Sequence, residues 1–340
     1  MKFRNLFILA VAAILLCLSS CKKKETEKTY MAGTLAFTND IPYYVMSGQK
    51  YALSGSGITA PDGTAVAYCF SNSANNKRDT VYTAPATVEF TVPDTLGTFS
   101  ITCTAFPVQS SDKYYVSAES RYFVIVSDKP GTDEGSLTGW EIRPDEAVEK
   151  IYGRDYYVVD AGGLQWIRTN LCRVDYDSAG KRVFGNAYAD SPAMQNIFGG
   201  YYTWEEAQKA CPAGWRLPSE KDWVNLLKSS GAPDTLAPMQ SSPSGAGNLM
   251  GFGAFNGETL WEYYRGVNVK DLNISALPFG FAMITSAGYE FVGYSEYAAF
   301  WTSDQYEGKG VYRYIYKESD EVFVGTADKN SFAANVRCVR

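Results

Sequence analysis

The chain has 340 residues and carries 31 lysines and arginines against 37 aspartates and glutamates, a formal net charge of −6. An acidic chain is a poor match for nucleic acid, because phosphates require clustered basic side chains. The sequence contains no histidine, which excludes Ser-His-Asp and Cys-His nucleophile systems, HExxH metal sites and ordinary histidine zinc sites. An enzyme would have to use carboxylates, tyrosines, lysines or cysteines.

Residues 1–20 have the pattern of a secretory signal peptide. Lys2 and Arg4 precede an apolar run from Leu6 to Leu18, which is too short to span a bilayer. Two serines then lead into Cys21, with a leucine three residues before it. This arrangement resembles the bacterial lipobox, in which the cysteine thiol receives a diacylglycerol and its freed amine is acylated. The alternative is an ordinary signal peptide whose first mature residue is cysteine.

The lipobox resemblance implies lipidation at Cys21 and anchoring in the outer membrane, because two or more acyl chains give stable attachment. We expect the protein to face the exterior, and the periplasmic face is the alternative. Residues 21–32 are polar and are expected to form a lipidated, flexible tether. Lys22, Lys23 and Lys24 either contact anionic headgroups or, as we expect, belong to a solvated spacer.

Residues 33–128 show a pattern of short β-strands. Apolar residues alternate with polar ones over Thr87–Val92 and Phe99–Ala105, and further strands are expected near Tyr51 and over Thr64–Ser71 and Tyr122–Val126. Turn signals recur at short intervals, which is typical of an all-β sandwich. We interpret this unit as an immunoglobulin-like domain.

The cysteines suggest disulfides, because an exported chain folds in an oxidising compartment. Seven occur in the sequence, of which Cys17 leaves with the signal peptide and Cys21 carries lipid. We pair Cys69 with Cys103 inside the sandwich, where the closed loop would contribute about 4 kcal/mol. Their spacing is short for an immunoglobulin disulfide, and no tryptophan lies between them.

Residues 129–139 are rich in small and polar residues and are expected to form a linker, after which 140–340 form a second domain containing all seven tryptophans. Thr203–Glu206 predicts a capping box that begins a helix ending at Cys211. Ser219–Asp222 predicts a second helix, with Gly231 as its stop. A strand is expected over Gly310–Tyr316. Two helices on a loop-rich β scaffold indicate the α+β class.

The string CPAGWRLPS from Cys211 to Ser219, followed by Trp223, resembles the Fibrobacter succinogenes major paralogous domain, a family of secreted and lipid-anchored bacterial proteins. The resemblance covers 140–340. The GWRLPS piece is also similar to the C-type-lectin-like fold, which implies a fold but no activity. Other family elements follow in the expected order: Trp166 with Asn170 and Leu171, Tyr201–Trp204, Leu277 with Pro278, Phe300–Ser303, and Val336–Val339.

The residues of this string also have a structural interpretation. We expect Trp215, Leu217 and Trp223 to pack a core across the turn between the two helices, with Arg216 held by a carboxylate.

The remaining cysteines lie in the second domain. A bridge between Cys211 and Cys338 would tie the end of the chain to the helical region, and closing so long a loop would contribute about 5 kcal/mol. Cys172 departs from the family motif. It is either a buried free thiol or a partner for another chain, and we expect an inert small hydrophobe.

We expect a lipid-anchored envelope protein of binding type, not an enzyme, that recognises carbohydrate or another extracellular polymer. The alternative is a structural or assembly component of the cell surface, fimbria-like or bound to a protein partner, with no small ligand. Tyrosine and tryptophan offer flat apolar faces for sugar rings and polar tips for hydroxyls. The candidate ligand-binding residues form two groups in the sequence, Trp261, Tyr263 and Tyr264, and Trp301, Asp304 and Tyr306.

The alternative interpretation of these aromatic residues is that they belong to the core. No Glu-Pro-Asn or Trp-Asn-Asp string supports a lectin-type calcium site, and no carboxylate pair stands out as that of a glycosidase. We therefore expect no metal and no cofactor. The expected partners are the membrane through the lipid anchor and a glycan or surface protein, and not nucleic acid.

Overall fold

The computed structural model describes residues 27–39, 41–109, 113–126, 137–138, 147–255, 258–261, 270 and 274–340. The predicted signal peptide, Cys21 and most of the predicted tether and linker lie outside the described residues. Within the described part, no helix is long and apolar enough to cross a membrane. The chain divides into two compact units, Met1–Asp40 with Ala52–Phe90 and Ser100–Arg121, and Ile41–Tyr51 with Thr91–Phe99 and Tyr122–Arg340.

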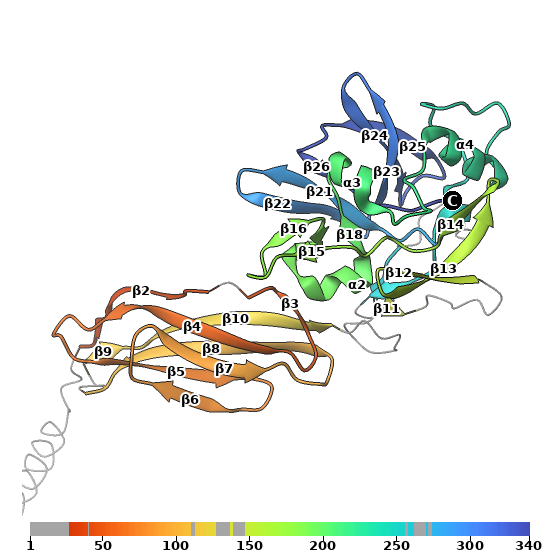
Figure 1. The fold of residues 1–340 in the computed structure, drawn as a ribbon. Helices are drawn as coiled ribbons and strands as arrows, with labels where there is room; N and C mark the ends of the chain where they lie inside the picture. Colours follow the sequence, from red (N-terminus) through yellow and green to blue (C-terminus); the bar gives the residue numbers. More distant parts are fainter. Residues whose placement is uncertain are drawn as a thin grey trace, which may run out of the picture. The chain divides into compact units, whose positions relative to one another are not determined.

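The N-terminal strands form two sheets that face each other (Figure 1). The Tyr68 hydroxyl in one sheet donates a hydrogen bond to the Ile58 carbonyl in the other, with an oxygen–oxygen distance of 3.3 Å. A three-stranded sheet has the order β2 (Ala32–Phe37), β4 (Lys50–Thr59), β7 (Ala86–Thr91), and a five-stranded sheet has the order β3 (Tyr44–Met46), β10 (Ser117–Val126), β8 (Gly97–Pro107), β5 (Val66–Asn72), β6 (Arg78–Val81). A short parallel pair joins β1 (Thr29–Tyr30) to β9 (Tyr114–Tyr115).

The predicted Cys69–Cys103 disulfide is wrong, because the two thiols are free. Strand β5 pairs with β8 so that Cys69 lies opposite Thr104, while Cys103 lies opposite Phe70. Neighbouring residues of a strand point to opposite faces of the sheet, so Cys69 and Cys103 project away from each other. Burial, with a smaller contribution from Cys69, raises the pKa of the Cys103 thiol to about 12.

The C-terminal region is also rich in β-structure. Its largest sheet has the order β22 (Gly288–Tyr294), β21 (Phe279–Thr285), β23 (Tyr297–Tyr306), β24 (Lys309–Tyr316), β25 (Val322–Ala327), with β26 (Phe332–Ala333) paired to β21. A second, antiparallel sheet contains β12 (Ala147–Ile151), β13 (Arg154–Ala161) and β14 (Leu164–Ile167). The smaller sheets are β11 (Leu137–Thr138) with β19 (Ala254–Phe255) and β20 (Glu258–Thr259), β15 (Asp175–Tyr176) with β16 (Arg182–Phe184), and β17 (Asn186–Ala187) with β18 (Gly200–Tyr201).

Both predicted helices are present, and both begin with the predicted capping box. Helix α3 (Trp204–Ala210) follows Thr203, whose hydroxyl accepts the Glu206 amide while Glu206 accepts the Thr203 amide. Helix α4 (Glu220–Ser229) begins in the same way at Ser219 with Asp222. These reciprocal bonds satisfy donors that a helix cannot satisfy internally. The other helices are short: η1 (Tyr188–Asp190), η2 (Pro192–Met194), α2 (Gln195–Phe198) and α5 (Ala246–Leu249).

A buried ion pair attaches α4 to the large sheet. Arg313 of β24 donates from Nε to Oε1 of Glu220 over 2.9 Å and from Nη2 to Oε2 over 2.5 Å, and both side chains are inaccessible to solvent. The Nη1 group of Arg313 donates to the Gln240 carbonyl. Such a bidentate pair fixes orientation, and removing one partner would leave a buried charge uncompensated. The start of α4 is therefore held in one position.

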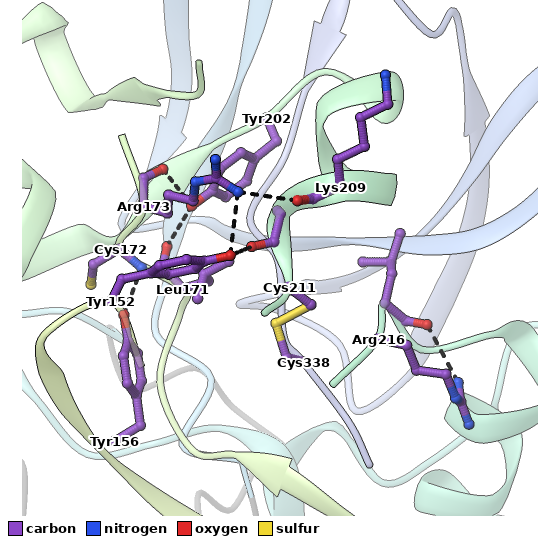
Figure 2. Close-up of a disulfide and its surroundings, with 12 residues drawn as sticks. Tyr152, Tyr156, Leu171, Cys172, Arg173, Tyr202, Lys209, Cys211, Arg216 and Cys338 are labelled. Atoms are coloured by element: carbon purple, nitrogen blue, oxygen red, sulfur yellow. Dashed lines mark hydrogen bonds between the residues drawn. A yellow bond between two sulfur atoms is a disulfide. The ribbon is translucent and has the colours of Figure 1, made fainter. Parts of the chain in front are cut away.

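The C-terminal segment 335–340 forms backbone hydrogen bonds with two other segments, one at the end of β14 and one in the GWRLPS string. Ile167 donates its amide to the Cys338 carbonyl, and Arg216 and Val339 exchange both backbone hydrogen bonds. Cys338 is joined to Cys211, with a Cα–Cα distance of 5.7 Å (Figure 2). This confirms the predicted disulfide, which connects the segment to the end of α3.

We predict that the double variant Cys211→Ser/Cys338→Ser loses about 2–5 kcal/mol of unfolding free energy, because the disulfide closes a long loop in the unfolded chain. The measurement is urea unfolding followed by tryptophan fluorescence, since all seven tryptophans lie in 140–340. Cys172→Ala, which changes an unpaired buried thiol, is the control and should cost about 1 kcal/mol. Equal losses in the two proteins would contradict a stabilising role for the bridge.

Candidate functional site

Two tryptophans predicted as ligand-binding residues lie in the core. Trp261 is 5% exposed, and its Nε1 donates to the Ala276 carbonyl over 2.8 Å. Trp301 is fully buried, and its Nε1 donates to the Tyr202 carbonyl over 2.7 Å. Neither ring is available at the surface to bind a ligand, and the alternative interpretation, that they belong to the core, is correct for these two residues. Each indole packs among apolar neighbours, and its only polar atom donates to a backbone carbonyl.

The other predicted residues of these clusters have different positions. An oxygen of Asp304 accepts the Glu220 amide over 2.7 Å, so this carboxylate caps the first turn of α4. Tyr306 is exposed at the end of β23. Tyr263 and Tyr264 lie outside the described residues, and their role stays a prediction.

An open groove lies beside the β13–β14 hairpin. Its volume is about 550 Å³, a size that suits a small ligand or one or two units of a polymer. Polar groups from three separate parts of the domain meet there, because the hairpin, the end of α4 and the last residue of segment 335–340 all contribute. The lining residues are Asp160, Ala161, Gly162, Gly163, Leu164, Gln165, Ser229 and Arg340.

The hairpin turn is fixed against α4 by a glycine. Gly162 has a φ of +59°, and a Cβ at this position would lie 2.6 Å from the Leu226 amide nitrogen. Only glycine permits both the backbone conformation and this close approach. The adjacent Gly163 also has a positive φ, but a Cβ there would meet no atom within 4 Å. The backbone of this turn, which lines the groove, is therefore held by its packing on α4.

Arg340 is held in a defined orientation at the groove. Its Nε donates to Oε1 of Gln165 over 2.8 Å, and its Nη2 donates to Oε1 of Glu149 over 2.6 Å. The guanidinium also lies over the ring of Trp215, 4.5 Å from its centroid. Such exposed contacts contribute little to stability, but together they fix a planar cation next to a partly exposed indole.

Arg216, the residue of the GWRLPS string after Trp215, is also held in place by neighbouring side chains. Arg216 forms an ion pair with Asp222, Nη1 to Oδ2 over 2.5 Å, which confirms the predicted carboxylate partner. Burial favours a higher pKa for Asp222, but hydrogen bonds from Arg216 and Ser219 outweigh it and hold the pKa below its usual value. Trp223 is buried as predicted, but it packs on Trp166 at 5.2 Å in a cluster separate from that of Leu217.

A cluster near the disulfide was not anticipated from the sequence. Arg173 donates to Asp175, and its guanidinium lies 4.2 Å from the ring centroid of Phe184. It also donates to the Tyr152 hydroxyl and to the Lys209 carbonyl, as Figure 2 shows. Its donors are used within the protein. The cluster therefore ties the β12–β13 turn to the end of α3 and is a structural contact.

Cys172 is a buried free thiol. Its backbone amide donates to the Tyr156 hydroxyl over 2.9 Å. Burial raises the pKa of the thiol, which keeps it protonated and unreactive at neutral pH. This agrees with the expected role of an inert small hydrophobe.

The chemical character of the groove follows from its side chains. Asp160 supplies an acceptor, Arg340 supplies donors and Gln165 supplies both. The Trp215 indole does not line the groove and contacts it only through the Arg340 guanidinium. Sequence reasoning missed these residues. The pair Gly162-Gly163 between alternating segments is a hairpin signal, but the approach of Ser229 and Arg340 depends on tertiary structure. Among the described residues, no group of three or more cysteines and acidic residues could hold a metal ion.

The family model described as the Fibrobacter succinogenes major domain matches residues 159–340. The match covers more than half of the chain, and the chain belongs to this family, as the ordered motifs predicted. The groove residues from Asp160 to Arg340 lie inside the match, whereas Glu149 lies before it. No curated protein matches the chain.

We predict that Gly162→Ala destabilises the domain by about 2–4 kcal/mol, because backbone strain and overpacking against α4 add together. Gly163→Ala is the matched control, since it introduces a comparable positive-φ strain without a clash and should cost about 1–2 kcal/mol. Urea unfolding with tryptophan fluorescence measures both. If the two variants lose equal stability, the hairpin does not pack on α4 as described.

Proposed function

We propose that the protein is a lipid-anchored component of the cell envelope that binds carbohydrate, or another polymer rich in hydroxyl groups, in the groove formed by Asp160, Gln165 and Arg340. The observation that supports this proposal is the meeting of a carboxylate, an amide and an oriented guanidinium beside the Trp215 indole. Sugar hydroxyls both donate and accept hydrogen bonds, so they pair with planar polar side chains of this kind.

The shape of the groove favours a polymer over a small apolar molecule. It is open, and polar side chains and glycine backbone line it together with Ala161 and Leu164, so it would leave much of a ligand in contact with water. A site for a compact apolar ligand would be enclosed and lined by apolar residues. An open groove instead accepts an internal segment of a chain that continues on both sides.

The proposal also includes a location at the outer membrane and a fold for each domain. Lipidation at Cys21 would attach the chain to the outer membrane, with the groove-bearing domain on the exterior. We interpret the N-terminal sandwich as immunoglobulin-like and the C-terminal domain as C-type-lectin-like, the latter from its GWRLPS string and its two capped helices. An immunoglobulin-like domain between tether and binding domain is a spacer in this proposal.

We predict that the unlipidated Cys21→Ser chain without residues 1–20 binds a member of a polysaccharide panel. Asp160→Asn should weaken this binding about tenfold, because a charge-assisted hydrogen bond contributes about 1.5–3 kcal/mol. Asp155→Asn is the matched control, since Asp155 is an exposed carboxylate on the same strand outside the groove. Tyr306→Ala should also leave binding unchanged. Calorimetric titration measures the affinities.

The outcomes separate the two functions that the sequence suggests. Equal weakening by Asp160→Asn and Asp155→Asn would place the ligand outside the groove. Absence of saturable binding across the panel, with the protein shown to be folded, would contradict carbohydrate binding and favour the structural or assembly role.

A further inference from the structure

Exposed apolar side chains gather at one end of the N-terminal sandwich. Tyr30 is 79% exposed and Tyr115 is 46% exposed, and Val108 and Val116 are also exposed. The rings of Tyr30 and Tyr115 lie together, with centroids 5.0 Å apart. We name this group, Tyr30, Val108, Tyr115 and Val116, the apolar end.

Strand pairing brings these residues to the same end. The start of β2 lies opposite the end of β4, where Ala32 pairs with Thr59. The start of β5 lies opposite the end of β8, and the Val108 amide donates to the Ala65 carbonyl. Strands β1 and β9 pair in parallel at this end, which Figure 1 shows as the end of the sandwich that carries β9.

The side chains of the apolar end suit a boundary between water and an apolar phase. Tyrosine combines a flat apolar ring with a polar hydroxyl, so it is favoured where one side of a surface is apolar and the other is wet. Tyrosines of this kind are enriched at the headgroup level of membranes. Val108 and Val116 add exposed apolar side chains directly after β8 and after β9.

The sequence places this end close to the lipid anchor. Tyr30 follows Cys21 by nine residues, which can span at most about 30 Å when fully extended. Lys28 and Lys113 are exposed at this end, and Lys22–Lys24 lie next to the anchor, although Glu25, Glu27 and Asp62 offset part of this charge. Lysines near a bilayer are attracted to anionic headgroups.

We propose that the apolar end rests in the headgroup region of the bilayer that holds Cys21, so that the sandwich stands on the membrane instead of moving freely on its tether. The inference rests on lipidation, one part of the proposed function, and is independent of what the groove binds. The two-residue pairing of β1 with β9 is too short to be stable alone, and contact with the bilayer stabilises it.

The test compares the lipidated full mature chain in phosphatidylcholine–phosphatidylglycerol vesicles with the unlipidated Cys21→Ser chain in buffer. Amide hydrogen exchange read by mass spectrometry should be at least about tenfold slower in vesicles for the peptides that contain Tyr30 and Tyr115, because docking suppresses local opening. The double variant Tyr30→Ser/Tyr115→Ser should lose this protection. Tyr122→Ser, which removes an exposed tyrosine from the interior of β10, is the control and should retain it.

Intact mass must show lipid on Cys21 in the vesicle sample. With lipid present, equal exchange in vesicles and in buffer overturns the proposal, as does retention of protection in the double variant. Absence of lipid on Cys21 overturns both the anchor and the docking, while binding in the groove can still be measured on the unlipidated chain.

Discussion

The C-terminal domain depends on the backbone hydrogen bonds of segment 335–340. Val336 and Cys338 accept amides from Leu171 and Ile167, Val339 exchanges two bonds with Arg216, and Asn335 bonds to the β23 backbone. Segments that are far apart in the sequence thus share one central strand-like segment. The Cys211–Cys338 disulfide makes one of these attachments covalent. Nearly all of these contacts join residues far apart in the sequence, so they form only when the tertiary structure forms.

The proposed binding groove is a consequence of that arrangement. Arg340 reaches the groove because Val339 and Cys338 are held in place, and Ser229 reaches it because the Glu220–Arg313 ion pair fixes α4. The side chains of Gln165, Ser229 and Arg340 are therefore oriented by contacts that do not involve a ligand. A site built in this way loses little conformational freedom on binding, which favours affinity for weakly binding polymers such as polysaccharides.

The features that the sequence predicted correctly are those with local causes or a specific motif. The capping boxes at Thr203 and Ser219 need only their own residues, and the alternation of β8 follows from one buried face. The family motifs led to the Cys211–Cys338 bridge. The Cys69–Cys103 pairing failed because it depends on strand register, and the burial of Trp261 and Trp301 could not be read from composition. The groove was missed because Asp160, Ser229 and Arg340 meet only through tertiary structure.

The central role of segment 335–340 is tested most directly by native-state hydrogen exchange followed at individual amides in the unlipidated chain. The account predicts that the amides of Ile167, Leu171, Arg216 and Val339 exchange together, with the highest opening free energy of the C-terminal domain, and that Cys211→Ser/Cys338→Ser lowers all four by the same amount. Independent exchange of Val339, faster than that of the strands of the large sheet, would show that the segment is a peripheral attachment and would contradict the account.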